Sequence, residues 1–121
     1  MSLCIVAGAK TTKLAIAAFT LAWTHSVEKT AWEEHWRIAP DSLVAVEARI
    51  ESLGGGMETP DDAVFDGHMW RWKPRLPPLP RLDLRKSDVI PEGWTLCFDN
   101  ECRQLGGHEE TADIVSLQPC E

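Results

Sequence analysis

His25 and Glu34 are the two residues whose types and positions most clearly suggest chemistry in this chain. Both lie on the apolar side of an alternating pattern that runs from Phe19 to Ile38, where a titratable side chain needs a physical reason. An imidazole and a carboxylate can hydrogen-bond each other. Such a pair could hold a ligand, take part in proton transfer, or satisfy two buried polar groups. Each of these roles requires the two side chains to meet.

The alternation predicts a β-hairpin that would bring them together. Its two runs are joined by a short polar link, and their apolar sides hold odd-numbered residues in the first run and even-numbered residues in the second. The loop must therefore contain an even number of residues. A four-residue loop over 28–31 gives the pairs Leu21–Ile38, Trp23–Trp36, His25–Glu34 and Val27–Trp32. In this register the Cβ atoms of His25 and Glu34 would be about 5 Å apart.

Three interpretations of the pair stay open at this point. It could be structural, it could form a ligand site with Ser26, Glu28 and the neighbouring tryptophans, or it could serve metal binding or acid–base chemistry. Ser26 and His35 point to the face opposite His25, which argues against a Ser–His nucleophile and against chelation by two histidines. No metal-ligand or nucleophile–base spacing occurs elsewhere, so the sequence favours a protein without catalytic residues, metal or cofactor.

The elements that must position these residues are further short strands. Apolar or alternating segments are separated by Gly, Pro and Asp turns, and no long segment has the helical period. The segments lie at 3–7, 13–17, 43–53, 69–73, 81–85 and 94–105. In the third segment, the residues predicted to face inward are Val44, Val46, Ala48 and Ile50. The pattern predicts an all-β fold over residues 1–105, a single-domain antiparallel β-sandwich or partly open β-barrel. Residues 106–121 are acidic and weakly patterned, and are predicted to form a mobile tail.

The chain has six tryptophans, and their positions predict two different roles. Trp23, Trp32 and Trp36 share the apolar side of the hairpin and are predicted to lie in the core. Trp70 and Trp72 share one side of a short strand that precedes a Pro-rich segment. Tryptophan is enriched at protein interfaces, so this second pair is a candidate contact surface.

Cys97 and Cys102 flank a predicted hairpin turn at Asp99-Asn100. That register puts the two cysteines opposite each other at a non-hydrogen-bonded position, with Cα atoms about 4.5 Å apart. This separation permits a disulfide, and two unlinked thiols or a metal site are the alternatives. Cys4 and Cys120 lie near the two ends and could also pair. A disulfide would indicate an oxidising compartment.

The charge of the chain excludes some partners. A net charge of −7 and an isoelectric point near 5.0 argue against nucleic acid and against an anionic membrane surface. No segment has the roughly 20 apolar residues of a membrane-spanning helix. The apolar stretch from Leu3 to Phe19 is not preceded by basic residues, so it is not a clear signal peptide and a cytoplasmic location stays open. The oligomeric state is not indicated.

Four short motifs stand out from the alternation. They are His25-Ser26-Val27-Glu28; Trp32-Glu33-Glu34 with Trp36; Gly54-Gly55-Gly56-Met57; and Trp94-Thr95-Leu96-Cys97. Over Phe19 to Leu105 the chain thereby resembles an uncharacterised bacterial family, the domain-of-unknown-function family numbered 1850. The His-Ser-Val-Glu element is the most specific part. Gly55 stands where the family usually has alanine, and the chain lacks the hydrophobic leader that members often carry.

The resemblance implies an accessory role. Genes of the family tend to lie beside tripartite solute-import systems of the TRAP/TAXI type, which use an extracytoplasmic solute-binding protein. A non-catalytic binding module with a transporter component as its partner, in the periplasm or cell envelope, is therefore implied. The family supplies no established catalytic residues. The alternative is a small-molecule-binding β-barrel, which could be an enzyme, with a site at His25 and Glu34.

Overall fold

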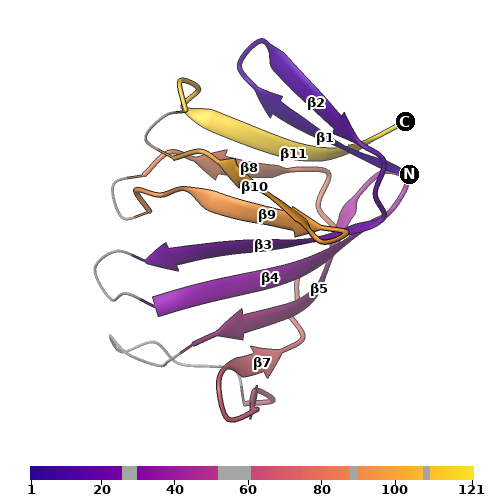
Figure 1. Ribbon diagram of the computed structural model, residues 1–121. Helices are drawn as coiled ribbons and strands as arrows, with labels where there is room; N and C mark the ends of the chain where they lie inside the picture. Colours follow the sequence, from indigo (N-terminus) through magenta and orange to yellow (C-terminus); the bar gives the residue numbers. More distant parts are fainter. Residues whose placement is uncertain (26–29, 52–60, 88–89, 108–109) are drawn as a thin grey trace.

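The computed structural model describes residues 1–25, 30–51, 61–87, 90–107 and 110–121, which form two antiparallel β-sheets (Figure 1). The strands are β1 (Ser2–Ala7), β2 (Lys10–Leu14), β3 (Ala18–His25), β4 (Thr30–Ile38), β5 (Leu43–Ile50), β6 (Val64–Phe65), β7 (Trp70–Trp72), β8 (Leu82–Arg85), β9 (Trp94–Phe98), β10 (Glu101–Leu105) and β11 (Ile114–Cys120). These residues contain no helix, so none that could span a membrane occurs among them. The all-β prediction is confirmed, and the sheets form a sandwich that is not closed into a barrel.

The smaller sheet has the strand order β2-β1-β11-β8. Its third strand comes from the segment predicted to form a mobile tail, and that prediction is wrong for Ile114–Cys120. This segment pairs with β1 over six residues and with β8 over four. Val115 is 1% exposed and Leu117 0% exposed, so this strand completes the core.

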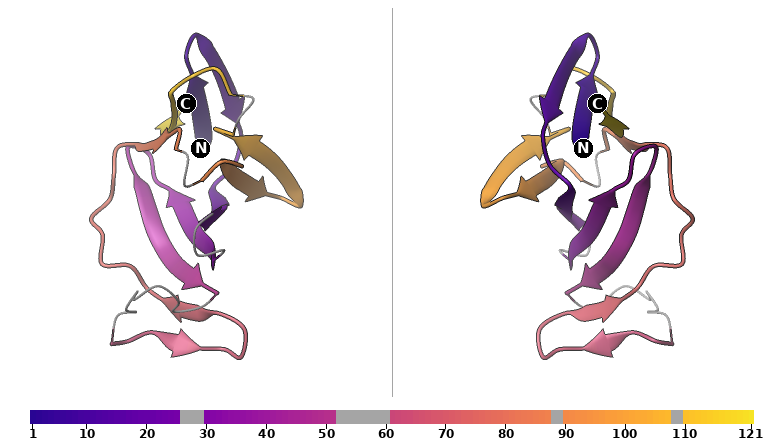
Figure 2. Two further views of the ribbon diagram at one scale, coloured as in Figure 1. Left: turned by 90° about the vertical axis from the view of Figure 1, so that its left-hand side faces the viewer. Right: turned by 90° about the vertical axis from the view of Figure 1, so that its right-hand side faces the viewer.

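The larger sheet has the order β10-β9-β3-β4-β5-β7-β6, with the predicted hairpin at its centre. Figure 2 shows β6 and β7 at the opposite end of the molecule from the β1–β2 hairpin. The Pro-rich segment after β7 leads to β8 in the smaller sheet. On the way it makes one bridge, in which the backbones of Leu43 and Leu79 exchange hydrogen bonds of 2.7 and 2.9 Å.

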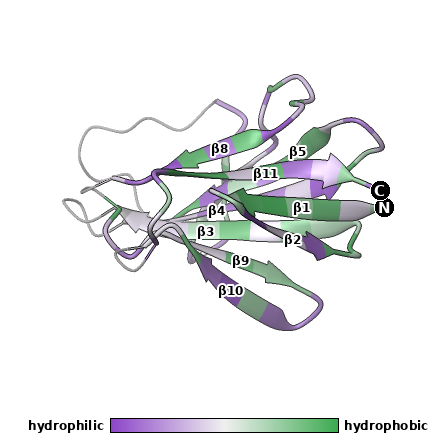
Figure 3. Cartoon of the chain, turned by 90° about the horizontal axis from the view of Figure 1, so that it is seen from above, coloured by the Kyte–Doolittle hydropathy of each residue, from purple (hydrophilic) through white to green (hydrophobic). Residues whose placement is uncertain are grey.

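One core lies between the sheets. Figure 3 shows the apolar stretches of β1 and β3, which contribute to this core. Leu3 and Leu117 from the smaller sheet meet Leu21, Ile38 and Leu96 from the larger one, and all five side chains are at most 1% exposed. As predicted, odd positions of β3 and even positions of β4 face inward.

The register of the β3–β4 hairpin differs from the predicted one. The observed pairs are Phe19–Trp36, Leu21–Glu34, Trp23–Trp32 and His25–Thr30. The connecting segment, 26–29, has an even length as required, but it lies two residues earlier than expected. Each β3 residue therefore pairs four residues earlier on β4. Alternation fixes only the parity of a register, because a shift by an even number keeps every side chain on its face.

A β-bulge in β5 corrects another expectation. His35 pairs with Glu47 whereas Trp36 pairs with Ala45, so Val46 is an extra residue in the strand. An extra residue reverses which face the neighbouring positions occupy. Leu43 and Ala45 consequently face inward before the bulge, and Ala48 and Ile50 after it. Val46, predicted to face inward, is 46% exposed instead, and Val44 is half-buried.

Two disulfides link the strands. Cys97 and Cys102 are directly opposite in the β9–β10 hairpin, with Cα atoms 4.1 Å apart. The turn residues Asp99 and Asn100 have φ values of 45° and 67°, as a tight hairpin turn requires. The second disulfide joins Cys4 in β1 to Cys120 in β11, with Cα atoms 5.8 Å apart. No free cysteine occurs among the described residues.

Candidate functional site

Glu34 lies in the middle of the inner face of the larger sheet. It is directly opposite Leu21 on β3 and Ala48 on β5, both of which are buried. Its nearest neighbours on the same side of β4 are Trp32 and Trp36, since side chains two residues apart share a face. A carboxylate thus occupies a position at which the surrounding pattern predicts an apolar side chain.

The indole of Trp36 gives this carboxylate its one hydrogen bond among the described residues. Nε1 of Trp36 donates to Oε1 of Glu34 over 3.2 Å. Burial raises the pKa of Glu34 above its ordinary value of 4.5, and the hydrogen bond from Trp36 only partly opposes this shift. Glu34 is therefore a half-buried acid whose ionised form is disfavoured by its surroundings.

His25 is not the partner of Glu34. The structure pairs His25 with Thr30, at the end of β3, and pairs Glu34 with Leu21. Four residues along a strand separate the two positions, which is roughly 13 Å. The expected cross-strand pair of His25 and Glu34 is therefore wrong, for the same reason as the predicted register. Ser26 and Glu28, assigned to the same site, lie outside the described residues.

Half-buried tryptophans lie on the same face of the sheet as Glu34, on β3, β4 and β7. The indoles of Trp23 and Trp32 are stacked, with ring centroids 5.9 Å apart and planes 6° apart. Next to them, Ile50 lies between Trp32 on β4 and Trp70 on β7 in direct register, and Ala48 pairs with Trp72. We call the five half-buried side chains on this inner face the tryptophan face: Trp23, Trp32, Glu34, Trp70 and Trp72.

The tryptophan face continues to the outermost strands of the larger sheet. The rings of Trp70 and Phe65 are 5.2 Å apart, and Phe65 is 50% exposed. Figure 1 shows β7 below β5, away from the strands of the smaller sheet. Of the three hairpin tryptophans predicted to be core residues, only Trp36 is fully buried, at 2% exposure. Trp23 packs against the core, and Trp32 belongs to this face.

The outer face of the same sheet carries a polar network that was not predicted from the sequence. Nδ1 of His35 is 3.2 Å from the hydroxyl of Thr20, and His35 pairs across the strands with Glu47. The Glu47 carboxylate accepts from Arg49 over 3.2 Å and lies 3.9 Å from Arg71. The bulge at Val46 places Glu47 opposite His35. In the sequence, only the acidic and basic residues of β5 could have indicated this network.

No group of three His, Cys, Asp or Glu side chains that could hold a metal ion occurs in the part of the chain that the structure describes. Glu34 faces indoles and aliphatic side chains, which suit contact and binding more directly than they suit proton transfer.

Fold and site together define an antiparallel β-sandwich with a half-buried aromatic face. A family model described as a domain of unknown function, DUF1850, matches residues 19–105, so the chain belongs to this family. The matched segment contains nearly all of the larger sheet and β8, and it ends before β11. No curated protein and no solved structure gives a significant match.

Proposed function

We propose that this protein is a non-catalytic accessory module that binds a protein component of a tripartite solute-import system. The tryptophan face is the observation that carries the proposal. Half-buried indoles on an otherwise complete sandwich are typical of a surface that a partner covers, because a large aromatic side chain supplies much contact area at little entropic cost. The genomic neighbourhood implied by the family resemblance supplies the kind of partner.

Trp70 and Trp72 are the part of this face best placed for a partner. They lie on a short strand next to the edge of the larger sheet, and the neighbouring Phe65 is half exposed. Trp72 pairs with Ala48, which in turn pairs with Glu34, so a partner bound at Trp72 would lie two strands from the half-buried carboxylate. The alternative site at His25 and Glu34 loses its geometric support, since those residues do not pair.

The cell envelope is the location that suits this role. Two disulfides are what proteins of oxidising compartments carry, and cytosolic thiols are ordinarily kept reduced. An extracytoplasmic position would also give the module access to a solute-binding protein.

The proposal is tested by capture from the native host. Tagged protein is incubated with gently solubilised cell envelopes, and bound proteins are identified by mass spectrometry. We expect a component of a tripartite import system, with recovery at least about tenfold lower for Trp70→Ala combined with Trp72→Ala, since buried aromatic anchors dominate interfaces. Leu76→Ala is the control, because Leu76 is 50% exposed but lies outside this face. Recovery of no import component, or equal recovery with the double variant, contradicts the proposal.

A further inference from the structure

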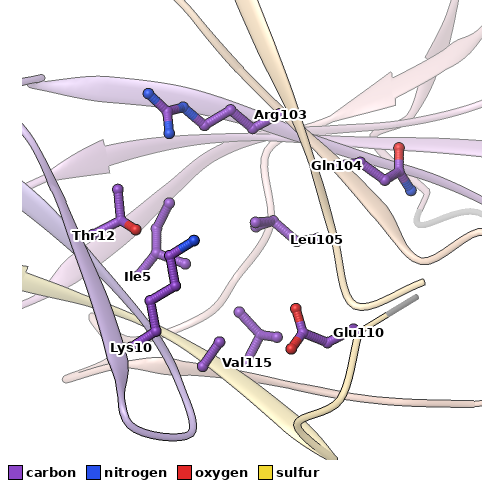
Figure 4. A pocket seen from close by; sticks show the side chains of 9 residues that line it. Ile5, Lys10, Thr12, Arg103, Gln104, Leu105, Glu110 and Val115 are labelled. Atoms are coloured by element: carbon purple, nitrogen blue, oxygen red, sulfur yellow. The ribbon is translucent and has the colours of Figure 1, made fainter. Parts of the chain in front are cut away.

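A hollow of about 350 Å³ lies where the edges of the two sheets meet (Figure 4). Its lining residues come from β1, β2 and β11 of the smaller sheet and from β10 of the larger one, together with Glu110. β2 and β10 are the edge strands of their sheets. The hollow therefore lies in the gap between these two edges, a gap that a closed barrel would not have. Its volume falls at the lower end of the range for small-molecule sites, about 300–1,000 Å³.

The floor of the hollow is the edge of the core. Ile5, Leu105 and Val115 line it, with exposures of 6%, 9% and 1%. These three side chains come from both sheets, and Ala7 extends the same apolar surface. A hydrocarbon group placed here would contact aliphatic side chains along this floor.

Two cations stand at the exposed rim above this floor. Lys10 pairs with Ala7 on β1 and Arg103 pairs with Leu96 on β9, so both occupy the side of their strand that carries core residues elsewhere. Thr12, opposite Ile5, adds a hydroxyl on the same side. In Figure 4, Lys10 and Arg103 extend from opposite walls, while Gln104 points away.

Glu110 is the one carboxylate among the residues that line the hollow, against these two cations. Neither Lys10 nor Arg103 belongs to an ion pair with a described residue. Arg103 is held instead by Phe98, whose ring centroid is 5.8 Å from the guanidinium carbon. The nearby carboxylate of Glu110 accepts a hydrogen bond from the backbone of Ala112 over 3.1 Å. The hollow thus carries one positive charge in excess, in a chain whose net charge is −7.

We propose that this hollow binds a small amphipathic monocarboxylate. Lys10, Arg103 and the Thr12 hydroxyl would hold the carboxylate, and the chain of the ligand would lie on Ile5, Leu105 and Val115. The single excess positive charge suits a monoanion better than a dianionic phosphate. The site is separate from the tryptophan face and does not depend on a transport partner.

The test is a titration of the whole oxidised protein with octanoate, followed by isotope-edited NMR. We expect saturable binding with a Kd of about 1 mM or tighter and shifts confined to residues of the hollow. Lys10→Gln and Arg103→Gln should each weaken binding about tenfold, since hydrogen bonds to charged groups are the strong ones. Both side chains are exposed, so the variants should fold normally. Lys73→Gln and Arg75→Gln remove the same charge elsewhere and should leave Kd unchanged.

Three ligand controls separate the contributions of head group and tail. Acetate lacks the tail, octanamide lacks the charge, and octyl phosphate carries a larger charge, so each should bind at least about tenfold more weakly than octanoate. Equal binding of acetate, or equal loss in the Lys73 and Arg75 variants, would reduce the effect to nonspecific anion attraction and overturn the proposal. Charges on edge strands can also simply prevent strand pairing between molecules. Self-association of the Lys10 and Arg103 variants without octanoate binding by the wild type would establish that role instead.

Discussion

Glu34 is a carboxylate whose pKa is raised by burial, so the folded protein holds its proton more tightly than the unfolded chain does. Its contribution to stability is therefore fully present below the unfolded pKa, near 4.5, and is lost as the pH rises through the folded pKa. Glu34→Gln keeps an oxygen that can accept from Trp36 but cannot ionise. We expect it to be more stable than the wild type at pH 7, with the difference shrinking toward pH 4.

Denaturant unfolding at several pH values measures this difference. Asp66 and Asp83, whose pKa values are lowered chiefly by hydrogen bonds, titrate in both proteins and cancel in the comparison. Glu33→Gln, one residue away on the outer face, is the matched control. A pH-independent difference between Glu34→Gln and the wild type would contradict the assigned environment.

Glu34→Ala isolates the hydrogen bond from Trp36. The alanine variant leaves a buried indole N–H without an acceptor, whereas the glutamine variant retains one. We expect the alanine variant to be less stable than the glutamine variant by about 1–3 kcal/mol. Glu33→Ala should change the free energy of unfolding by no more than about 0.5 kcal/mol. Equal midpoints for the alanine and glutamine variants would show that Trp36 does not depend on this carboxylate.

At the scale of the hairpin, the stacking of Trp23 on Trp32 distinguishes the observed register from the predicted one. In the register expected from alternation, Trp23 faces Trp36, and the two stacked residues are not partners. A double-mutant cycle with Trp23→Ala and Trp32→Ala should give a coupling energy of about 0.5–1.5 kcal/mol. The cycle of Trp23→Ala with Trp70→Ala, which have two strands between them, should be additive within about 0.5 kcal/mol. Coupling in the second cycle but not in the first would refute the observed pairing.

β11 is the element whose prediction differed most from the structure. Leu117 is fully buried between the sheets, so Leu117→Ala should cost about 2–5 kcal/mol in the free energy of unfolding. Gln118→Ala, on the outer face of the same strand, should cost no more than about 0.5 kcal/mol. If Leu117→Ala were as mild as Gln118→Ala, the segment would behave as the tail that its composition suggested.

Period-two alternation was sufficient for the fold class, the inward faces of β3 and β4, and the Asp99-Asn100 turn, because each depends on a few adjacent residues. It was insufficient for features that depend on contacts between residues distant in the sequence. The pairing of Trp23 with Trp32 selects one register among several of equal parity. Val115 and Leu117 alternate with polar residues as a strand should, but acidic flanks and Pro119 concealed this. The pairing of β8 with β11 covers only Ile114–Leu117, so β8 does not reach Pro119. The N–H that proline lacks can be tolerated at such a position.

The candidate site was predictable only in part. Glu34 was identified because a carboxylate interrupts an apolar face, and its inward position is confirmed by its buried neighbours. Its partner was not predictable, because that depends on the register. Lys10 and Arg103, at the rim of the hollow, gave no signal in the sequence, since a charge on an edge strand looks like an ordinary surface residue.

For the molecule as a whole, the two disulfides should contribute unequally to stability. Cys4 and Cys120 are 116 residues apart in sequence, whereas Cys97 and Cys102 are five apart. In the chain-entropy account, a cross-link of the first length stabilises by about 5 kcal/mol and one of the second by about 2 kcal/mol. Replacing both cysteines of a pair by serine, and comparing unfolding midpoints, measures each contribution. A larger loss on removal of Cys97 and Cys102 would contradict this ranking.

The cross-link between β1 and β11 also determines how the molecule responds to mechanical load. Tension applied at Ser2 and Glu121 enters within two residues of Cys4 and Cys120, so the covalent bond carries the force and the sheets are shielded from it. In a single-molecule pulling experiment the oxidised protein should behave as an inextensible link. Once this bond is reduced, unfolding under load should lengthen the chain by roughly 400 Å, at about 3.4 Å per residue. Redox state would then decide whether the domain acts as a stiff spacer or as an extensible tether.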